Sequence, residues 1–142
     1  MKLAHIIIFL FSFGSANLLA QADIAGKYMA VDDRGGEPKS IVEVYHDGRS
    51  YRAKVLRFLP AAITKTCDGC TGSERGRTLI GMDIFWGLTS SGKDFRGGEI
   101  LDPRSGRTYD VLAYLEDDFL VVRGYIKFPI FGLSLRWKKV ES

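Results

Sequence analysis

The sequence has few of the side chains that commonly carry out chemistry in proteins. Its 142 residues include only two cysteines and two histidines, and only His46 lies beyond the N-terminal segment. A Ser-His-Asp or Cys-His catalytic arrangement would have to use this histidine, which precedes the turn signal Asp47-Gly48 and is most simply a solvated turn residue. A zinc site needs four ligands, more than His46 and two thiols supply. We therefore expect a protein that is not an enzyme and that uses no metal or cofactor.

The sequence also lacks an excess of charge of one sign. It has 20 Lys and Arg against 17 Asp and Glu, and the two signs are interspersed. Nucleic-acid binding, which needs a basic patch, is therefore not expected. The carboxylate pairs Asp32-Asp33 and Asp117-Asp118 fall in expected turns, where aspartate side chains bond the local backbone, so they do not indicate acid-base catalysis or calcium binding.

The N-terminal segment has the organisation of a secretory signal peptide. Lys2 precedes the apolar run 6–11, and the small-x-small pattern Ala20-Gln21-Ala22 follows. Polar residues interrupt the apolar stretch, which is therefore shorter than the about 20 residues that a membrane-spanning helix needs. We expect cleavage after residue 22. The remaining residues, 23–142, would form one soluble domain in the periplasm or outside the cell, with no stable membrane insertion.

No segment after residue 22 keeps a helical period for three turns, whereas period-two alternation and turn signals recur. The dipeptide Asp47-Gly48 predicts a two-residue hairpin turn that pairs Val44 with Tyr51 and Val42 with Ala53 on an apolar, inward face. The eight expected strands cover residues 24–31, 40–46, 49–58, 78–85, 93–101, 107–115, 119–126 and 131–140.

A second hairpin organises the centre of the chain. Asp102-Pro103 opens its turn, Gly106 closes it, and the pair Gly97-Gly98 indicates a bulge or a sharp bend of the sheet. Eight short antiparallel strands with mostly tight connections favour a single all-β, up-and-down β-barrel. A sandwich of two sheets is the alternative. The interior of an eight-stranded barrel holds either packed side chains or one small ligand.

Several motifs recur in one order along the chain and resemble a bacterial family of small exported proteins known as domain of unknown function 2147. The resemblance implies a barrel similar to lipocalins, whose hallmark is an early Gly-x-Trp close to a basic residue of the last strand. Tyr28 takes the place of that tryptophan here, with Arg136 or Lys138 as its basic partner. The matching motifs are Gly26-x-Tyr28, the cysteine-containing loop, Gly81-Met82, Gly97-Gly98-x-Ile100-x-Asp102-Pro103-x-x-Gly106-x-x-Tyr109, Arg123-Gly124-Tyr125, and Gly132 with Trp137.

The pair Cys67 and Cys70 lies in a long polar loop, residues 60–77. Three interpretations are open: a small structural disulfide, a thiol-disulfide exchange site, and part of a metal site. An oxidising compartment favours the disulfide. Exchange sites usually stand at the start of a helix, which this loop does not resemble, and a metal site lacks further ligands.

The aromatic side chains either fill the barrel or line a pocket for an apolar or amphipathic molecule. The candidate pocket residues are Tyr51, Tyr109 and Trp137, with Trp86 near a rim. Arg123 is either an outward charge or an anchor for an anionic head group, because its strand is apolar on both faces. We expect an exported barrel that binds a small lipophilic ligand in the bacterial envelope. The alternatives are an envelope interaction or stress-response protein with a filled barrel, of unknown protein partners, and a thiol-disulfide exchange protein.

Overall fold

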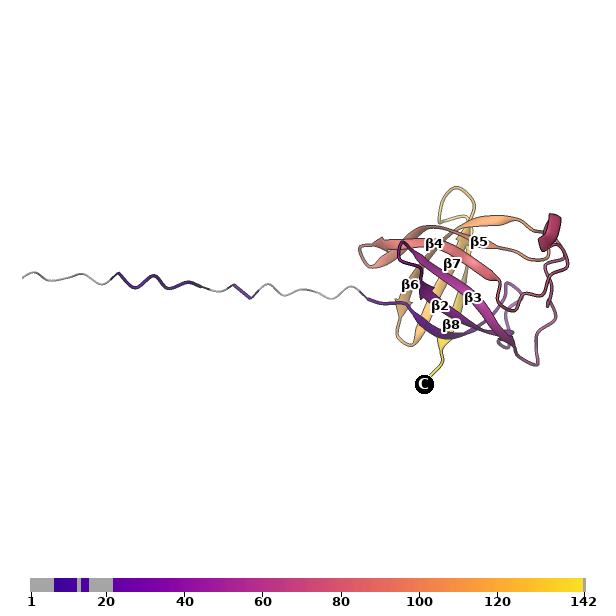
Figure 1. Ribbon diagram of the computed structural model, residues 1–142, viewed down its shortest axis with the longest axis horizontal. Coiled ribbons are helices and arrows are strands. Elements are labelled where there is room, and N and C mark those ends of the chain that lie inside the picture. Colours follow the sequence, from indigo (N-terminus) through magenta and orange to yellow (C-terminus); the bar gives the residue numbers. More distant parts are fainter. Residues whose placement is uncertain (1–6, 13, 16–21, 142) are drawn as a thin grey trace, which may run out of the picture.

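The chain forms a closed eight-stranded antiparallel barrel, seen in a computed structural model that describes residues 7–12, 14–15 and 22–141 (Figure 1). Each strand pairs with its sequence neighbours, and β1 closes the ring by pairing with β8. The predicted up-and-down barrel is therefore confirmed and the two-sheet sandwich is excluded. The strands are β1 (Gly26–Ala30), β2 (Ser40–His46), β3 (Tyr51–Phe58), β4 (Asp83–Ser91), β5 (Asp94–Leu101), β6 (Thr108–Glu116), β7 (Phe119–Tyr125) and β8 (Gly132–Lys139).

The predicted signal peptide, residues 1–22, lies largely outside the described residues, and its cleavage stays a prediction. The described residues 7–12 and 14–15 are exposed and form no helix or strand. In the part of the chain that the structure describes, no helix is long and apolar enough to cross a membrane.

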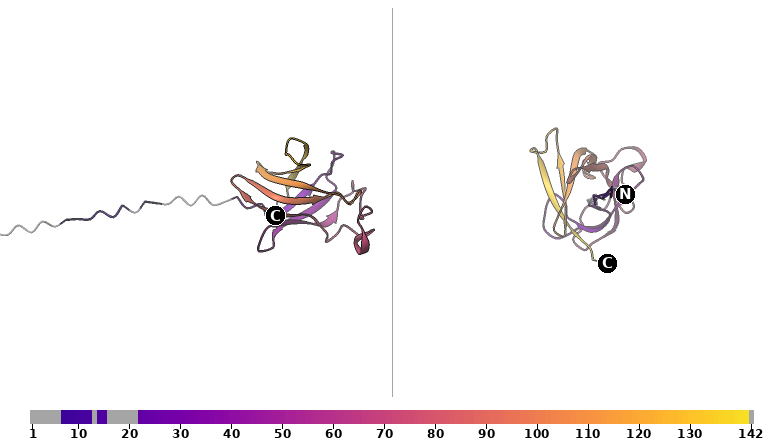
Figure 2. Two further views of the ribbon diagram at one scale, coloured as in Figure 1. Left: turned by 90° about the horizontal axis from the view of Figure 1, so that it is seen from above. Right: turned by 90° about the vertical axis from the view of Figure 1, so that its left-hand side faces the viewer.

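The two ends of the barrel differ in their connections (Figures 1 and 2). At one end lie the start of β1, the C-terminal end of β8 and three short turns. At the other end lie the β1–β2 loop, the long β3–β4 loop with the short 3-10 helix Gly72–Glu74, the β5–β6 turn and the β7–β8 loop. We call these the N-terminal end and the loop end.

The β2–β3 hairpin has the predicted strands and inward face but a different register. Val44 pairs with Ala53 and Val42 with Val55, two residues from the predicted pairing, so that prediction was wrong. Asp47 opens the turn instead of occupying its centre, because its Oδ1 accepts hydrogen bonds from the backbone N–H groups of Arg49 and Ser50. Gly48 takes the left-handed φ of 98° that this turn needs. A shift of two residues keeps every side chain on its predicted face.

The predicted irregularity at Gly97-Gly98 is confirmed. The β5–β6 register shifts between Phe95 and Gly98, and Gly97 has a φ of 82°. A Cβ on Gly98 would lie 2.5 Å from the carbonyl oxygen of Trp86, so β4 and β5 approach more closely here than another residue allows. The strand before this bend was predicted at 78–85 but runs from Asp83 to Ser91, because the chain before it is held by turn hydrogen bonds such as Met82 N–H to the Leu79 carbonyl.

The core occupies the N-terminal end and the middle of the barrel. Tyr28, Phe85, Leu88 and Leu120 are fully buried there. Ile24, just before β1, is also fully buried and accepts a 2.9 Å hydrogen bond from the Tyr28 hydroxyl through its carbonyl oxygen. This end of the barrel is therefore filled and sealed by side chains.

Candidate ligand-binding cavity

A cavity of about 500 Å³ opens at the loop end of the barrel. It lies above the packed core and is bordered by residues from all four loop-end connections. Because the N-terminal end is filled, the cavity has a floor and one mouth. The barrel thus combines the two interiors that its size permits, packed side chains in one part and an open space in the other.

Trp137 of β8 forms part of the floor of the cavity. Its side chain is 2% exposed and stacks on Phe85, with ring centroids 5.9 Å apart and planes 16° from parallel. Its indole Nε1 donates a 3.2 Å hydrogen bond to the carbonyl oxygen of Val31, just after β1. The only polar atom of this large side chain is therefore satisfied, and the indole presents apolar surface to the cavity.

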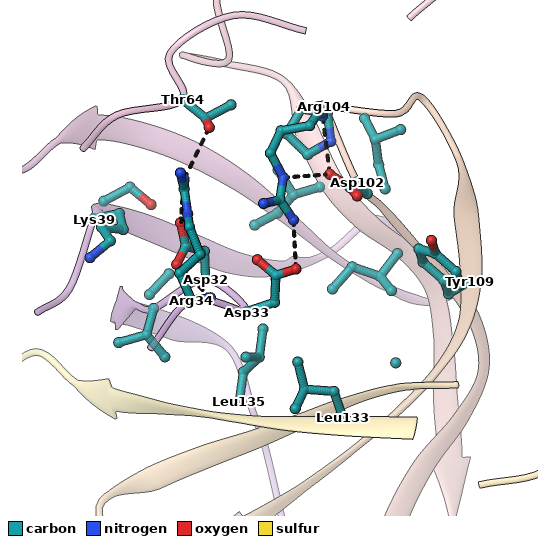
Figure 3. Close-up of a pocket in the computed structure, with 18 of the residues that line it drawn as sticks. Asp32, Asp33, Arg34, Lys39, Thr64, Asp102, Arg104, Tyr109, Leu133 and Leu135 are labelled. Carbon is teal, nitrogen blue, oxygen red and sulfur yellow. Dashed lines mark hydrogen bonds and ion pairs between the residues drawn. The ribbon is translucent and has the colours of Figure 1, made fainter. Parts of the chain in front are cut away.

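The walls are mainly aliphatic. Leu133 and Leu135 project from β8 on the side that Trp137 occupies, as the alternation of the strand requires, and Tyr109 of β6 faces them across the space (Figure 3). Further apolar side chains come from β3, β4 and β5. They are Val55, Ile84, Ile100 and Leu101.

One side of the mouth carries a guanidinium-carboxylate pair. Arg34 bonds the carboxylate of Asp32 at 2.8 Å and also donates a 3.2 Å hydrogen bond to the hydroxyl of Thr64, so it links the β1–β2 loop to the β3–β4 loop (Figure 3). Partial burial alone would raise the pKa of Asp32. The hydrogen bonds and positive charge of Arg34 outweigh it and lower this pKa below its usual value.

A second arginine ties the β5–β6 turn to the β1–β2 loop. Arg104 bonds the carboxylate of Asp33 and, at 3.3 Å, that of Asp102. The hydrogen bonds that Arg104 donates to Asp33, first, and then to Asp102 raise the pKa of its guanidinium, which stays charged. The rim is thus polar but electrically balanced, with two arginines and Lys39 beside three aspartates (Figure 3).

The cysteine loop packs against the same rim. Cys67 and Cys70 form a disulfide, as predicted. Cys67 is fully buried, and its Sγ lies 3.7 Å from the carbonyl oxygen of Pro103 in the β5–β6 turn. A buried sulfur is poorly placed for attack by another thiol, which favours a structural role. Among the described residues, no group of three or more His, Cys, Asp or Glu side chains is arranged to hold a metal ion.

The structure brings together two of the five residues proposed from the sequence, Tyr109 and Trp137. Tyr51 lies inside the barrel but at the N-terminal end, where its hydroxyl donates to Asp23 and its ring packs edge-on against Phe95. The other two lie on the outside of the barrel.

Trp86 pairs with Glu99 across β4 and β5, and its Nε1 donates to the Glu99 carboxylate at 3.2 Å. Arg123 donates to the carbonyl oxygen of Pro129 at 2.7 Å and to the hydroxyl of Ser134 at 2.8 Å. Arg123 is therefore an outward charge that holds the β7–β8 loop. Tyr28 lies opposite Lys139 in the β1–β8 ladder, whereas Arg136 binds Glu116.

The sequence interpretation missed the aliphatic walls and the charged rim. Leu133, Leu135 and Trp137 alternate along β8 and so share one face, but alternation does not show whether that face meets packed side chains or a cavity. Asp32, Asp33 and Asp102 were interpreted as turn residues. They are in turns, and their additional role as partners of Arg34 and Arg104 depends on contacts between loops distant in sequence.

The barrel is similar to a solved structure from a bacterial pathogen. "Protein HP1028 from the human pathogen Helicobacter pylori", described as belonging to the lipocalin family, superposes with a TM-score of 0.72 at 18% identity, over 84% of each chain. At this identity the likeness shows the shared fold alone. No curated protein matches the chain.

The family assignment comes from the sequence itself. Residues 26–139 match the family described as "Uncharacterized protein conserved in bacteria (DUF2147)". The match runs from the first residue of β1 to the last residue of β8, so it spans every strand and every loop around the cavity. The resemblance seen in the motifs is confirmed, and the chain belongs to the bacterial family DUF2147.

Proposed function

We propose that the protein is an exported, non-enzymatic carrier that holds a small amphipathic lipid, such as a fatty acid, in the cavity at the loop end. The single observation that carries this proposal is a 500 Å³ space with a floor of Trp137, aliphatic walls and a polar mouth. Cavities that bind small molecules span about 300–1,000 Å³ and combine apolar walls with few polar groups.

The distribution of polar groups favours an amphipathic ligand over a fully apolar one. The side chains of Leu133, Leu135 and Ile100 offer an acyl chain a surface from which water is displaced, at roughly 25 cal/mol per Å² of apolar area. Arg34 and Arg104 stand at the mouth, where the head group would lie among charged side chains and water. Export is supported by the predicted signal peptide, and the carrier role by the fold shared with a lipocalin-family protein.

Tryptophan fluorescence provides a direct test, because the chain has two tryptophans. In a Trp86→Phe variant the remaining indole is Trp137, on the cavity floor. We expect its emission to change saturably when a medium-chain fatty acid is added below its micelle concentration. In a Trp137→Phe variant the remaining Trp86 lies on the outer surface, and we expect no such change.

Two matched leucine variants separate cavity binding from general adsorption. Leu133 and Leu115 are 51% and 39% exposed, so both tolerate a polar side chain, but only Leu133 lines the cavity. Leu133→Lys places a charge in the wall and is expected to weaken binding about tenfold or more, whereas Leu115→Lys is expected to bind as the parent protein does. Equal binding by the two variants, or no response of Trp137 to fatty acids or lysophospholipids, would contradict the proposal. Native mass spectrometry of protein purified from its own envelope then identifies the bound molecule.

A further inference from the structure

The loop between β7 and β8 exposes an unusual amount of apolar surface. Five large apolar side chains lie in residues 126–133, and their exposed fractions range from 51% to 78%. We call this segment the apolar hairpin. Figure 1 shows it, in yellow, projecting beyond the strands at the top of the view. Its exposed apolar residues are Ile126, Phe128, Ile130, Phe131 and Leu133.

Hydrogen bonds hold the hairpin in this exposed conformation. The N–H of Phe131 donates to the Phe128 carbonyl at 2.9 Å, and the N–H of Phe128 donates to the Ile126 carbonyl at 2.7 Å. From the barrel wall, Arg123 donates to the Pro129 carbonyl. Phe128 and Phe131 also pack edge-on, with ring centroids 6.5 Å apart. The apolar side chains are therefore exposed as part of an ordered structure.

The same bonds prepare the hairpin for an apolar environment. A backbone polar group that enters lipid without a partner costs several kcal/mol. In this loop the N–H groups of Ile126, Phe128 and Phe131 are already bonded within the hairpin, and Pro129 has no N–H. Most of the backbone polar groups of the hairpin therefore already have a partner and would not lose a hydrogen bond on entering a bilayer interface.

The charge of the surrounding segment is of one sign. Residues 119–135, which form the hairpin and the strand segments next to it, contain Arg123 and Lys127 and no Asp or Glu, and Lys127 stands within the hairpin itself. Lysine beside aromatic and aliphatic side chains is the combination that binds the interface of membranes with anionic lipids. A protein partner with a hydrophobic groove would not need this bias.

The hairpin is also continuous with the cavity. Ile126, Phe131 and Leu133 border the mouth, and Ile63 of the β3–β4 loop, 72% exposed, borders it as well. A surface bound by the hairpin would therefore lie next to the opening of the cavity.

We propose that the apolar hairpin docks the protein on the surface of a lipid bilayer that contains anionic phospholipid. Phe128 and Ile130, at its tip, enter the interface, and Lys127 contacts the head groups. This docking goes beyond carriage of a ligand and does not depend on it.

Vesicle flotation tests the proposal. We expect the protein without residues 1–22 to float with vesicles of phosphatidylcholine mixed with phosphatidylglycerol, and more weakly with phosphatidylcholine alone. A Phe128→Ser/Ile130→Ser variant is expected to lose about tenfold or more of its partition into the mixed vesicles. Lys127→Glu is expected to abolish the preference for phosphatidylglycerol. Leu115→Ser, which changes an exposed leucine of β6, is expected to bind as the parent protein does.

Three results would overturn the proposal: no binding to either vesicle, undiminished binding by the Phe128→Ser/Ile130→Ser variant, or a dimer without vesicles that this variant dissociates. The last result would assign the hairpin to contact between copies of the chain. Neither Phe128 nor Ile130 lines the cavity, so the variant should still give the Trp137 response to free fatty acid. Loss of vesicle binding with an intact Trp137 response separates docking from carriage.

Discussion

The backbone N–H of Gly69 donates a 2.9 Å hydrogen bond to the carbonyl oxygen of Pro103. This bond joins the disulfide loop to the β5–β6 turn, two segments that the chain order places on either side of β4 and β5. The turn carries Arg104, which binds the β1–β2 loop across the rim. The cysteine loop therefore supports one side of the cavity mouth through the turn against which it packs.

Removing the disulfide should lower the free energy of unfolding by a modest amount. Closing a loop of four residues stabilises a protein by about 2 kcal/mol in the chain-entropy model. We expect a Cys67→Ala/Cys70→Ala variant to lose about that amount in urea unfolding. Reductant should bring the parent protein to the same stability and leave the variant unchanged. A variant as stable as the oxidised parent would show that the disulfide does not constrain the fold.

The close contact between Gly69 and Gly106 allows a sharper test. A Cβ on Gly106 would lie 1.9 Å from the Gly69 carbonyl oxygen, and Gly106 has a φ of 74°. Gly76, in the same loop end, also has a φ of 74° but no atom within 4 Å of its Cβ position. Gly76→Ala therefore measures the backbone strain alone, about 1 kcal/mol. Gly106→Ala should cost about 1–3 kcal/mol more, because the loop and the turn must separate. Equal unfolding free energies would show that the contact is dispensable.

Much of the fold follows from local sequence patterns. Alternation and turn residues predicted eight strands and the bulge at Gly97-Gly98, because these depend on near neighbours. The β2–β3 register was missed since Asp47-Gly48 allows a turn centred on either side of Gly48. Only the hydrogen bonds from Arg49 and Ser50 to the Asp47 carboxylate decide between them.

The residues that line the cavity were harder to predict from the sequence than the strands. Period-two alternation tells which face of a strand a residue occupies, but its height along the barrel axis depends on strand tilt, stagger and bulges. Tyr51 and Trp137 both point inward, yet Tyr51 lies at the N-terminal end of the barrel and Trp137 forms part of the cavity floor. The direction of the Arg123 side chain was ambiguous because its strand is apolar on both faces. Val121 and Leu112, which lie on the outer face with Arg123, are in fact buried as well.

Because of the ion pair between Arg34 and Asp32, the free energy of unfolding should decrease at low pH. The folded pKa of Asp32 is below the ordinary value of 3.8, so the unfolded chain binds its proton first. The contribution of the ion pair to the free energy of unfolding is therefore complete above about pH 4 and is lost as the pH falls through the pKa of Asp32 in the folded protein. We expect Asp32→Asn to be less stable than the parent by about 0.5–1 kcal/mol at neutral pH, as for a partly exposed pair. The difference should vanish in strong acid. A difference that is the same at every pH, measured by urea unfolding, would contradict this role.

Tyr28 should make the barrel sensitive to alkali. Burial first, and then the nearby Asp23, raise the pKa of its hydroxyl to about 12, from 10.0 for an exposed tyrosine. The unfolded chain ionises first as the pH rises, so the stability that Tyr28 contributes is complete below pH 10 and is lost towards pH 12. The loss amounts to roughly 2–3 kcal/mol.

A Tyr28→Phe variant separates this titration from the other tyrosines. At neutral pH it should be about 1 kcal/mol less stable than the parent, because the Ile24 carbonyl loses its hydrogen bond. Above pH 10 the parent should lose stability faster than the variant, and the two unfolding free energies should converge or cross. Parallel curves from pH 7 to 12 would mean that the Tyr28 hydroxyl ionises as readily in the barrel as in the unfolded chain. The seal at the N-terminal end would then admit water to this side chain.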